Sequence, residues 1–438
     1  MKPIDVKKKL SAAIDGVASN SRDYCVNAKS DFKRNRKLPF KQMIQGIIGM
    51  GGGSLSNEIL DMSKYSLKTA STAAFVQQRS KIKPEAFATV FQSFSSNISQ
   101  DFTEGMRVLA IDGSAMQIAT NPNDVDSFFP GTNGQKPYNL LHLNALYDLK
   151  HHIYIDAVIQ KAKYRNEHKS FIDMVDRSDI KNALVIADRG YESYNNMAHI
   201  QEKGWKFLIR VKDGNTGIKS CLDLPQQQEY DVEVHLKLTR KQTKEVKPLL
   251  KDRNHYRYIA VSSPFDYLPS KSRKRDAILF YELRFRVVRF RIGDDTFETV
   301  LTNLDGQIYP PQKLKELYAG RWGIETSFRD LKYTLGMLHF HSKKVMCIQQ
   351  EIYAHLIMYN FSEMITSHVV IKQTQRKHIY KANFSVAVHM CRLFYHQKIT
   401  SPILEAIISR NVIPVRPGRH NVRKNSDKSF KGFLYRIV

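Results

Sequence analysis

Cysteines and long apolar segments are scarce in this sequence, and both absences exclude whole classes of protein. The chain of 438 residues contains 4 cysteines, none of them in a C-x-x-C pair: Cys25, Cys221, Cys347 and Cys391. A disulfide framework or a zinc ribbon is therefore not expected, and a reducing compartment suits the chain. No apolar run approaches the roughly 18 residues that a membrane-spanning helix needs. Since the first residues also run into Lys7–Lys9 without the apolar segment of a signal peptide, we predict a cytoplasmic protein without a membrane partner.

Acidic residues are few in comparison with basic ones. The chain has 68 Lys and Arg against 42 Asp and Glu, so its formal net charge at pH 7 is +26. Hydrophobic residues make up 42% of the sequence and aromatic residues 11%, which predicts a folded protein rather than a disordered one. A strongly positive surface attracts polyanions, and nucleic acid is the first candidate partner.

The spacing of apolar residues predicts a mixed α/β fold. Residues 1–100 show helical spacing, and Ser54 is expected to cap a helix. Short apolar runs at 107–111 and 183–187 predict buried strands, and from about 213 to 300 alternating residues predict a β-rich insertion. Helical spacing returns from Pro311 to about Arg410.

Two acidic residues stand where the predicted buried strands end. Asp112 follows the run from Arg107 to Ile111, and Asp188 follows the run from Ala183 to Ala187. Catalytic residues of open α/β sheets commonly lie at such strand ends. Taken singly, an aspartate followed by glycine at the end of a strand is usually part of a turn.

A third acid lies on a predicted helix among cationic residues. At about 3.6 residues per turn, one stripe of this helix carries Tyr318, Arg321, Glu325 and Lys332, with Arg329 beside it. Alone, such a pattern is most often surface ion pairing. Together with the two aspartates, however, it predicts carboxylates that hold two Mg²⁺ ions for phosphodiester displacement, for which Mn²⁺ would also serve. The cations beside Glu325 would then anchor DNA phosphates.

These residues also carry a resemblance to bacterial insertion-sequence transposases of the DDE type, in particular to the family with the signature Y-x2-R-x3-E-x6-K. Tyr318, Arg321, Glu325 and Lys332 fit that signature without deviation. The segment Asp112–Ser114 matches the D-G-[ST] context of the family's first acid, and Asp188–Tyr191 matches the D-R-G-[YF] context of its second. The resemblance extends from about Phe32–Lys37 to Arg416–Arg419.

The resemblance implies an RNase H-like catalytic core interrupted by a β-rich insertion, with helical N-terminal and C-terminal regions. It implies that Asp112, Asp188 and Glu325 are the metal-binding catalytic triad and that Tyr318, Arg321 and Lys332 contact the transposon end. The expected activity is binding of terminal inverted repeats, cleavage at the element ends and joining of the 3′-hydroxyls to target DNA by a cut-and-paste route. The expected partners are double-stranded DNA and a second copy of the chain in the DNA complex, in the nucleoid of a bacterial cytoplasm.

The composition and the resemblance together predict the domain boundaries. They are a helical DNA-binding domain at 1–100, the first part of the catalytic core at 101–212, the β-rich insertion at 213–303, the second part of the core with the Glu325 helix at 304–345, and a helical C-terminal region with a basic tail at 346–438.

Further basic residues are candidate DNA contacts, although such residues are often only solvated. They are Lys33, Arg34, Arg36, Lys37, Arg189, Arg273, Lys274, Arg275 and Arg329. Arg189 is equally suited to pairing with a carboxylate. Two other functions stay open on the sequence: a DDE-type nuclease without strand transfer, and a non-catalytic DNA-binding regulator of transposase origin.

Overall fold

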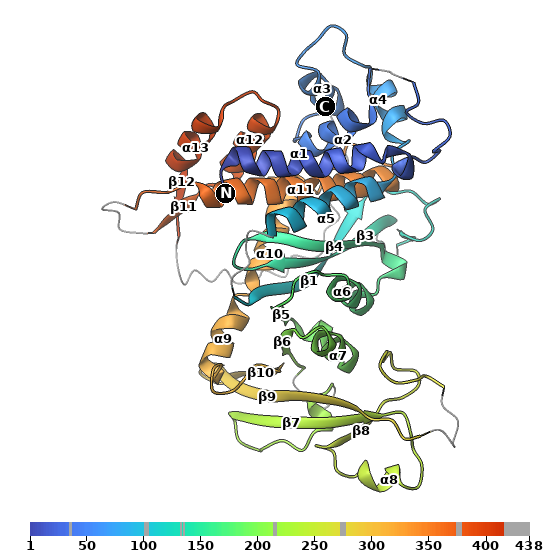
Figure 1. The fold of residues 1–438 in the computed structure, drawn as a ribbon, viewed down its shortest axis with the longest axis vertical. Coiled ribbons are helices and arrows are strands. Elements are labelled where there is room, and N and C mark those ends of the chain that lie inside the picture. Colours follow the sequence, from blue (N-terminus) through green and yellow to red (C-terminus); the bar gives the residue numbers. More distant parts are fainter. Residues whose placement is uncertain are drawn as a thin grey trace.

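One β-sheet runs through most of the length of the molecule in a computed structural model, with a layer of helices across one end (Figure 1). The structure describes residues 1–34, 37–99, 105–131, 134, 136–212, 217–271, 277–373 and 379–415. Across these residues the strand order is β2-β3-β1-β5-β6-β10-β9-β7-β8, and β4 pairs with β3. The strands are β1 (Arg107–Ile118), β2 (Phe128–Phe129), β3 (Tyr138–Asp148), β4 (Ile153–Lys161), β5 (Ala183–Ala187), β6 (Lys206–Arg210), β7 (Tyr230–Thr239), β8 (Tyr256–Tyr258), β9 (Tyr281–Gly293) and β10 (Thr296–Thr302).

The strands of the region expected to be β-rich extend this same sheet. β10 pairs antiparallel with β6, for example Leu301 with Ile209, and β9 and β7 follow outward. β1, β5 and β6 lie side by side in parallel, while β1 pairs antiparallel with β3. The parallel strands at the centre are buried on both faces, which explains their continuous apolar runs.

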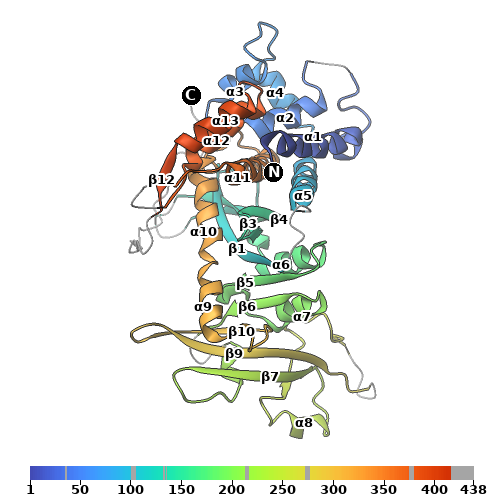
Figure 2. The same cartoon turned by 60° about the vertical axis from the view of Figure 1, so that its left-hand side comes forward.

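Helices cover the two faces of the central strands. On one face lie α6 (Glu167–Asp176) and α7 (Tyr194–Glu202). On the other face α9 (Pro311–Ala319) and α10 (Trp322–Arg329) follow one another almost as one rod, as Figure 2 shows. A π-helical turn, Asp330–Thr334, extends the rod.

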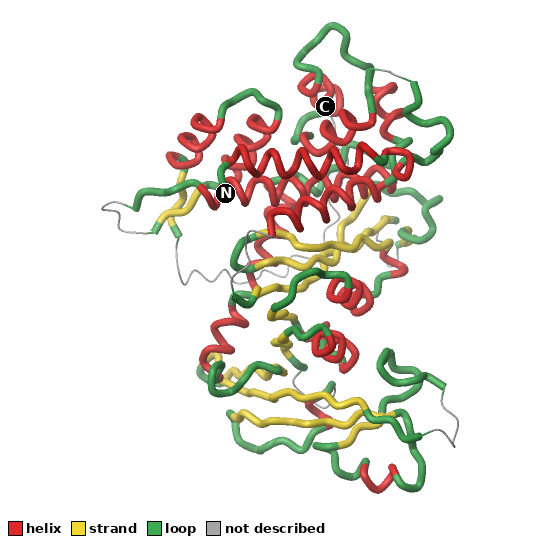
Figure 3. Tube along the Cα trace, viewed as in Figure 1, coloured by secondary structure: helices red, strands yellow, loops and turns green. Residues whose placement is uncertain are grey.

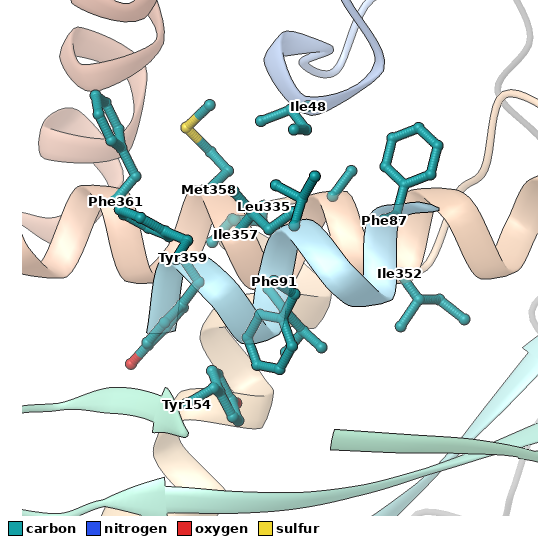
Figure 4. Packing of buried hydrophobic residues seen from close by; sticks show 14 of the residues in the cluster. Ile48, Phe87, Phe91, Tyr154, Leu335, Ile352, Ile357, Met358, Tyr359 and Phe361 are labelled. Atoms are coloured by element: carbon teal, nitrogen blue, oxygen red, sulfur yellow. The ribbon is translucent and has the colours of Figure 1, made fainter. Parts of the chain in front are cut away.

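The helices of the N-terminal and C-terminal regions pack together across the β3–β4 end of the sheet (Figure 3). Figure 4 shows Phe87 and Phe91 of α5 among Ile352, Ile357 and other residues of α11. Ser54 caps α3 as expected, since its Oγ accepts the N–H of Asn57 at 3.4 Å. The helices here are α1 (Pro3–Ser19), α2 (Phe40–Gly49), α3 (Leu55–Met62), α4 (Thr72–Arg79), α5 (Pro84–Ser99), α11 (Val345–His368), α12 (Phe384–Tyr395) and α13 (Ser401–Arg410).

Two short strands within the last region escaped the sequence prediction. β11 (Tyr380–Ala382) and β12 (Val412–Pro414) form a small antiparallel sheet beside α12 and α13. Strands this short leave almost no periodic signal in a sequence. Within the described residues, no helix has both the length and the apolar character needed to cross a membrane.

The prediction that the first strand ends at Asp112 was wrong. β1 continues to Ile118, because its pairing with β3 runs from Leu109 to Ile118, whereas its pairing with β5 stops at Ala110. Asp112 therefore lies within a strand, next to Ala145 of β3. It lies two residues beyond the last backbone pair with β5, so one edge of the strand is open there.

Candidate active site

Asp112 and Asp188 come together at the end of the parallel pairing between β1 and β5. Ala110 of β1 is the register partner of Ile186 of β5. Two residues further along each of these segments, Asp112 lies beside Asp188. Neighbouring strands are about 4.8 Å apart, and side chains two residues apart share a face. The two aspartates therefore follow Ala110 and Ile186 on the face that α9 and α10 cover.

Burial and neighbouring charges act on the Asp112 carboxyl. Burial raises its pKa to about 6; the Gly113 amide and the Arg321 guanidinium lower it, and the charges of Asp188 and Glu325 raise it again. Its Oδ1 accepts the N–H of Gly113 at 2.8 Å, and the Oδ1 of Asp188 accepts the N–H of Gly190 at 2.8 Å. The three acids predicted as a triad are thus close enough to influence one another electrostatically.

Arg321 lies between two of these acids. Its Nη2 donates to Oε1 of Glu325 at 2.7 Å, and its Nη1 lies 3.8 Å from Oδ2 of Asp112. Ile324 and Phe328 of α10 are buried in the same cluster as Ala110 of β1, which turns Glu325 and Arg321 toward the sheet. Arg321 is only 7% exposed, and its guanidinium is a counter-charge for both acids.

The other residues of the predicted stripe lie along the same rod. Tyr318 is buried among Leu314, Leu184 and Ile186, and the Arg321 guanidinium carbon lies 5.9 Å from the centre of its ring. Lys332 is half-buried in the π-helical turn, where the regular helical spacing used for the prediction no longer holds. The structure thus brings Tyr318, Arg321 and Glu325 together and places Lys332 one irregular turn beyond.

The remaining predicted DNA contacts are dispersed. Arg189 is exposed directly after Asp188, and Arg329 is exposed on the last turn of α10. Lys33, Arg34 and Lys37 are exposed in the segment before α2, in the helical layer rather than beside the three acids. Arg36 and the loop residues Arg273, Lys274 and Arg275 lie outside the described residues.

An ion pair beside Asp188 was missed by the sequence prediction. Ala187 is the register partner of Ile209, so the next residues, Asp188 and Arg210, are neighbours on the same face. Nη1 of Arg210 lies 3.2 Å from Oε1 of Glu298 in β10. The only sequence signal was a charged residue at the end of an apolar run, and its acidic partner lies far along the chain.

A second group, on the opposite face of β1, was also missed. His142 of β3 and Glu167 at the start of α6 form an ion pair, with Nε2 and Oε1 2.9 Å apart. Both lie against Gly113, and Tyr191 is buried nearby against Phe171 of α6. An acid at the start of a helix is ordinary in sequence terms, so nothing in the sequence singled out Glu167.

The described residues contain no cluster of three or more His, Cys, Asp or Glu side chains arranged to hold a metal ion. Asp112, Asp188 and Glu325 nevertheless fit a divalent cation chemically, because all three offer hard oxygen donors. Burial raises the pKa of the Asp112 carboxyl, Arg321 lowers it only in part, and Asp188 and Glu325 add to the negative charge there. A cation would compensate it.

Three comparisons place the chain among known proteins. The family model described as the transposase DDE domain matches residues 103–361, more than half of the chain. The transposase InsG for insertion sequence element IS4 of Escherichia coli (strain K12) is 22% identical over 343 residues, which cover 75% of this chain and 70% of that protein. A piggyBac transposase structure, solved as a synaptic complex with hairpin DNA, is 11% identical with a TM-score of 0.46, covering 98% of this chain and 88% of that one. The match to the family model shows that this chain belongs to the transposase DDE domain family.

Proposed function

We propose that this protein binds the terminal inverted repeats of an insertion sequence, cleaves DNA at the element ends and joins the 3′-hydroxyls to target DNA. The observation that carries the proposal is the meeting of Asp112 and Asp188 on one face of the sheet with Glu325 on the helix that covers it. The +26 charge of the chain suits a polyanionic substrate.

Asp112, Asp188 and Glu325 are the residues that would hold Mg²⁺, with Mn²⁺ as a substitute. Two such ions activate an attacking oxygen and stabilise a leaving oxygen in phosphodiester displacement. The role of the chain is to present the three carboxylates from β1, the end of β5 and α10. Arg321 donates to Glu325, and if a bound cation compensated that carboxylate, the guanidinium would be available to a DNA phosphate.

Further residues would orient the DNA. Arg321 and Lys332, with the Tyr318 hydroxyl, are proposed to contact the transposon end close to the scissile phosphate. Exposed Arg189 and Arg329 flank the three acids and are suited to phosphates further along the strand. Lys33, Arg34 and Lys37 lie in the helical layer and are proposed to contact the inverted repeat away from the cleavage point.

The catalytic core is proposed to be RNase H-like, with residues 101–212 and 304–345 contributing to it and 213–303 as the insertion. Residues 1–100 would bind the terminal repeat. Residues 340–410, in the helical C-terminal region, are proposed as the contact between two copies when two element ends are held together.

Cleavage of a labelled duplex that carries the terminal repeat tests the proposal. The intact protein with Mg²⁺ is expected to cut at the element boundary and then yield joined products on a denaturing gel. Glu325→Gln is expected to bind the duplex without cutting it, whereas Glu316→Gln, which changes an exposed acid on α9, should cut normally.

The products separate the rival functions. If the intact protein cuts at the element boundary and yields no joined products, its function is that of a nuclease and not of a transposase. Binding without any metal-dependent cut by the intact protein would overturn catalysis and leave a DNA-binding regulator.

A further inference from the structure

The helix that carries Glu325 is short, and the regular helix is interrupted on both sides of it. α10 spans eight residues, Trp322–Arg329. The preceding helix, α9, ends at Ala319, and the π-helical turn begins at Asp330. A helix this short is only marginally stable by itself, so its place depends on tertiary packing. The position of the Glu325 carboxylate over the sheet therefore depends on what holds α10.

A pair of hydroxyls joins α10 to β4 in the protein interior. The Tyr154 hydroxyl of β4 lies 2.7 Å from Oγ of Ser327 in α10, and the two residues are 0% and 1% exposed. Ser327 donates its single hydroxyl proton to the carbonyl oxygen of Ile324 at 2.7 Å, so the phenol is the donor between the two hydroxyls. Burial raises the pKa of the Tyr154 phenol well above its ordinary value, and the phenol therefore keeps its proton at neutral pH.

Tyr154 is itself held by the helical layer. The side-chain amide of Asn360 in α11 accepts the backbone N–H of Tyr154 at 2.8 Å and donates to its carbonyl oxygen at 2.7 Å. The same amide nitrogen lies 3.0 Å from Oγ of Ser95 in α5. One chain of buried hydrogen bonds thus runs from α5 through α11 and β4 to the helix that carries Glu325.

Packing holds α10 against the same strands. The Tyr154 ring lies 6.1 Å from the ring of Phe328 in α10 and 5.0 Å from the ring of Tyr359 in α11, and Figure 4 shows Tyr154 and Tyr359 together. Near the start of α10, a Cβ added at Gly323 would lie 2.9 Å from Cδ2 of Leu149, which follows β3. The missing side chain therefore allows α10 to lie close to the end of β3.

We propose that the hydrogen bond from Tyr154 to Ser327 positions Glu325 over the sheet for DNA cleavage. The inference rests on the proposed function, since Glu325 is one of the three acids proposed to act there. Ser327 follows Glu325 by two residues in α10. Arg321, one turn before Glu325, lies 3.8 Å from Asp112, so a small shift of α10 changes the distances between the acids. Misplacement of a reacting group by about 1 Å can lower a rate about a hundredfold.

Tyr154→Phe tests the proposal, because it removes the hydroxyl and keeps the ring. The matched control is Tyr147→Phe. Tyr147 belongs to the same buried cluster and is 1% exposed, but its hydroxyl lies 3.0 Å from that of Tyr359 in α11. Each variant loses one buried hydroxyl, and only Tyr154→Phe loses the hydrogen bond to α10.

Three quantities are measured on the full chain. They are the dissociation constant for the labelled duplex, the single-turnover cleavage rate with Mg²⁺, and the affinity for Mn²⁺ without DNA, from the electron paramagnetic resonance signal of free Mn²⁺. Tyr154→Phe is expected to cleave about tenfold or more slowly and to bind DNA within about twofold of normal. Its Mn²⁺ binding should weaken about tenfold or more, as when groups that support metal ligands are lost.

The control should cleave DNA and bind Mn²⁺ normally. Both tyrosine variants should melt at similar temperatures, about 4 °C or less below the unaltered protein, because each loses about one hydrogen bond. Equal losses of cleavage in Tyr154→Phe and Tyr147→Phe would overturn the proposal, because they would reflect the shared aromatic cluster and not the bond to α10.

Two other outcomes separate this inference from the proposed function. Normal cleavage and Mn²⁺ binding by Tyr154→Phe, in an assay in which the unaltered protein cuts, would overturn the positioning role and keep the proposed function. Absence of any metal-dependent cut by the unaltered protein would overturn the proposed function and the positioning role with it.

A second variant covers the case in which Tyr154→Phe does not fold. Ser327→Ala removes the acceptor from the α10 side and is expected to slow cleavage to a similar extent, so normal cleavage by this protein would contradict the proposal. Because the two hydroxyls form one bond, the double variant should be at most about threefold slower than the slower single variant. Losses that multiply in the double variant would show that the two hydroxyls act independently.

Discussion

The half-buried carboxylate of Asp112 in β1 and the buried carboxylate of Glu351 in α11 have opposite electrostatic surroundings. Burial alone would raise the pKa of Glu351, but Arg79 and His341 lower it to about 2. Burial raises the pKa of Asp112 to about 6, and its neighbours include two further acids. At Glu351 the neighbouring cations outweigh the effect of burial, whereas at Asp112 burial outweighs the neighbouring cation.

The compensated group joins segments that are far apart in the sequence. Oε1 of Glu351 lies 2.9 Å from Nη1 of Arg79 in α4, and His341 donates its backbone N–H to Glu351. Nε2 of the His341 ring lies 3.1 Å from the carbonyl oxygen of Gly53. These contacts join α4, α11 and the segment before α3, so this network stabilises the fold. Around Asp112, two further acids add negative charge, which suits a cationic ligand.

The comparison is tested most strongly by removing the charge of Asp112. Asp112→Asn is expected to lower DNA cleavage about a thousandfold or more, which corresponds to about 4 kcal/mol of transition-state stabilisation. Rates from denaturing gels, at equal concentrations of folded protein, provide the measurement. Glu316→Gln is the control, and near-normal cleavage by Asp112→Asn would place catalysis elsewhere.

Removal of the other buried charge should affect the fold and not the chemistry. Glu351→Gln leaves Arg79 buried without its counter-ion and is expected to reduce the free energy of unfolding by about 3–5 kcal/mol. Urea titration measures this loss. Cleavage per folded molecule should stay within about twofold of normal, and a much larger fall would show that the network also serves catalysis.

The two carboxylates should also respond to pH in opposite directions. The folded-state pKa of Asp112, about 6, lies above its ordinary value of 3.8, so ionisation costs stability as pH rises from about 4 to 6. In EDTA, Asp112→Asn should therefore be more stable than the unaltered protein by about 1–3 kcal/mol above pH 6 and equally stable below pH 4.

Glu351 has the opposite sign. Because its folded-state pKa of about 2 lies below its ordinary value of 4.5, its contribution is present above pH 4.5 and is lost as pH falls toward 2. Thermal melts of Asp112→Asn and Glu351→Gln between pH 2 and pH 7 show over which pH range each carboxylate changes the stability of the protein. Parallel pH profiles for the two variants would contradict the comparison.

The smallest expected effect concerns the backbone beside Asp112. Gly113→Ala places a methyl group against the buried His142 ring and should destabilise the protein by about 1–2 kcal/mol. Gly16→Ala is the control, because nothing lies within 4 Å of a Cβ at Gly16 and alanine favours the helix. Calorimetry should show the melting temperature falling for the first variant and rising slightly for the second.

Part of the site could be predicted from the sequence because its signals are local. Asp112 and Asp188 follow apolar runs, and Glu325 shares a helical stripe with Arg321 and Tyr318. Lys332 lies in a π-helical turn, where regular helical spacing does not fix its position relative to Glu325, so its place on the stripe stays a prediction. The end of β1 was placed too early, because pairing with β3 continues where pairing with β5 stops.

Other features carry no local signal at all. Glu167 resembles any acid in the first turn of a helix, and its ion pair with His142 depends on the space left at Gly113. Glu351 resembles a solvated helical glutamate until Arg79, far away in the chain, is packed against it. The charge balance of a buried group depends on contacts between distant segments, which spacing in the sequence does not describe.

The sequence by itself determined the chemical groups of this transposase-family protein: three acids in recognisable contexts, basic neighbours and a strong excess of positive charge. The tertiary structure alone decided which acids share a face, which cation lies between them and which carboxylates are compensated. The reason is physical. A local pattern determines whether a residue lies on a strand or a helix, whereas electrostatic energy depends on burial and on distances of a few ångströms between residues that only folding brings together.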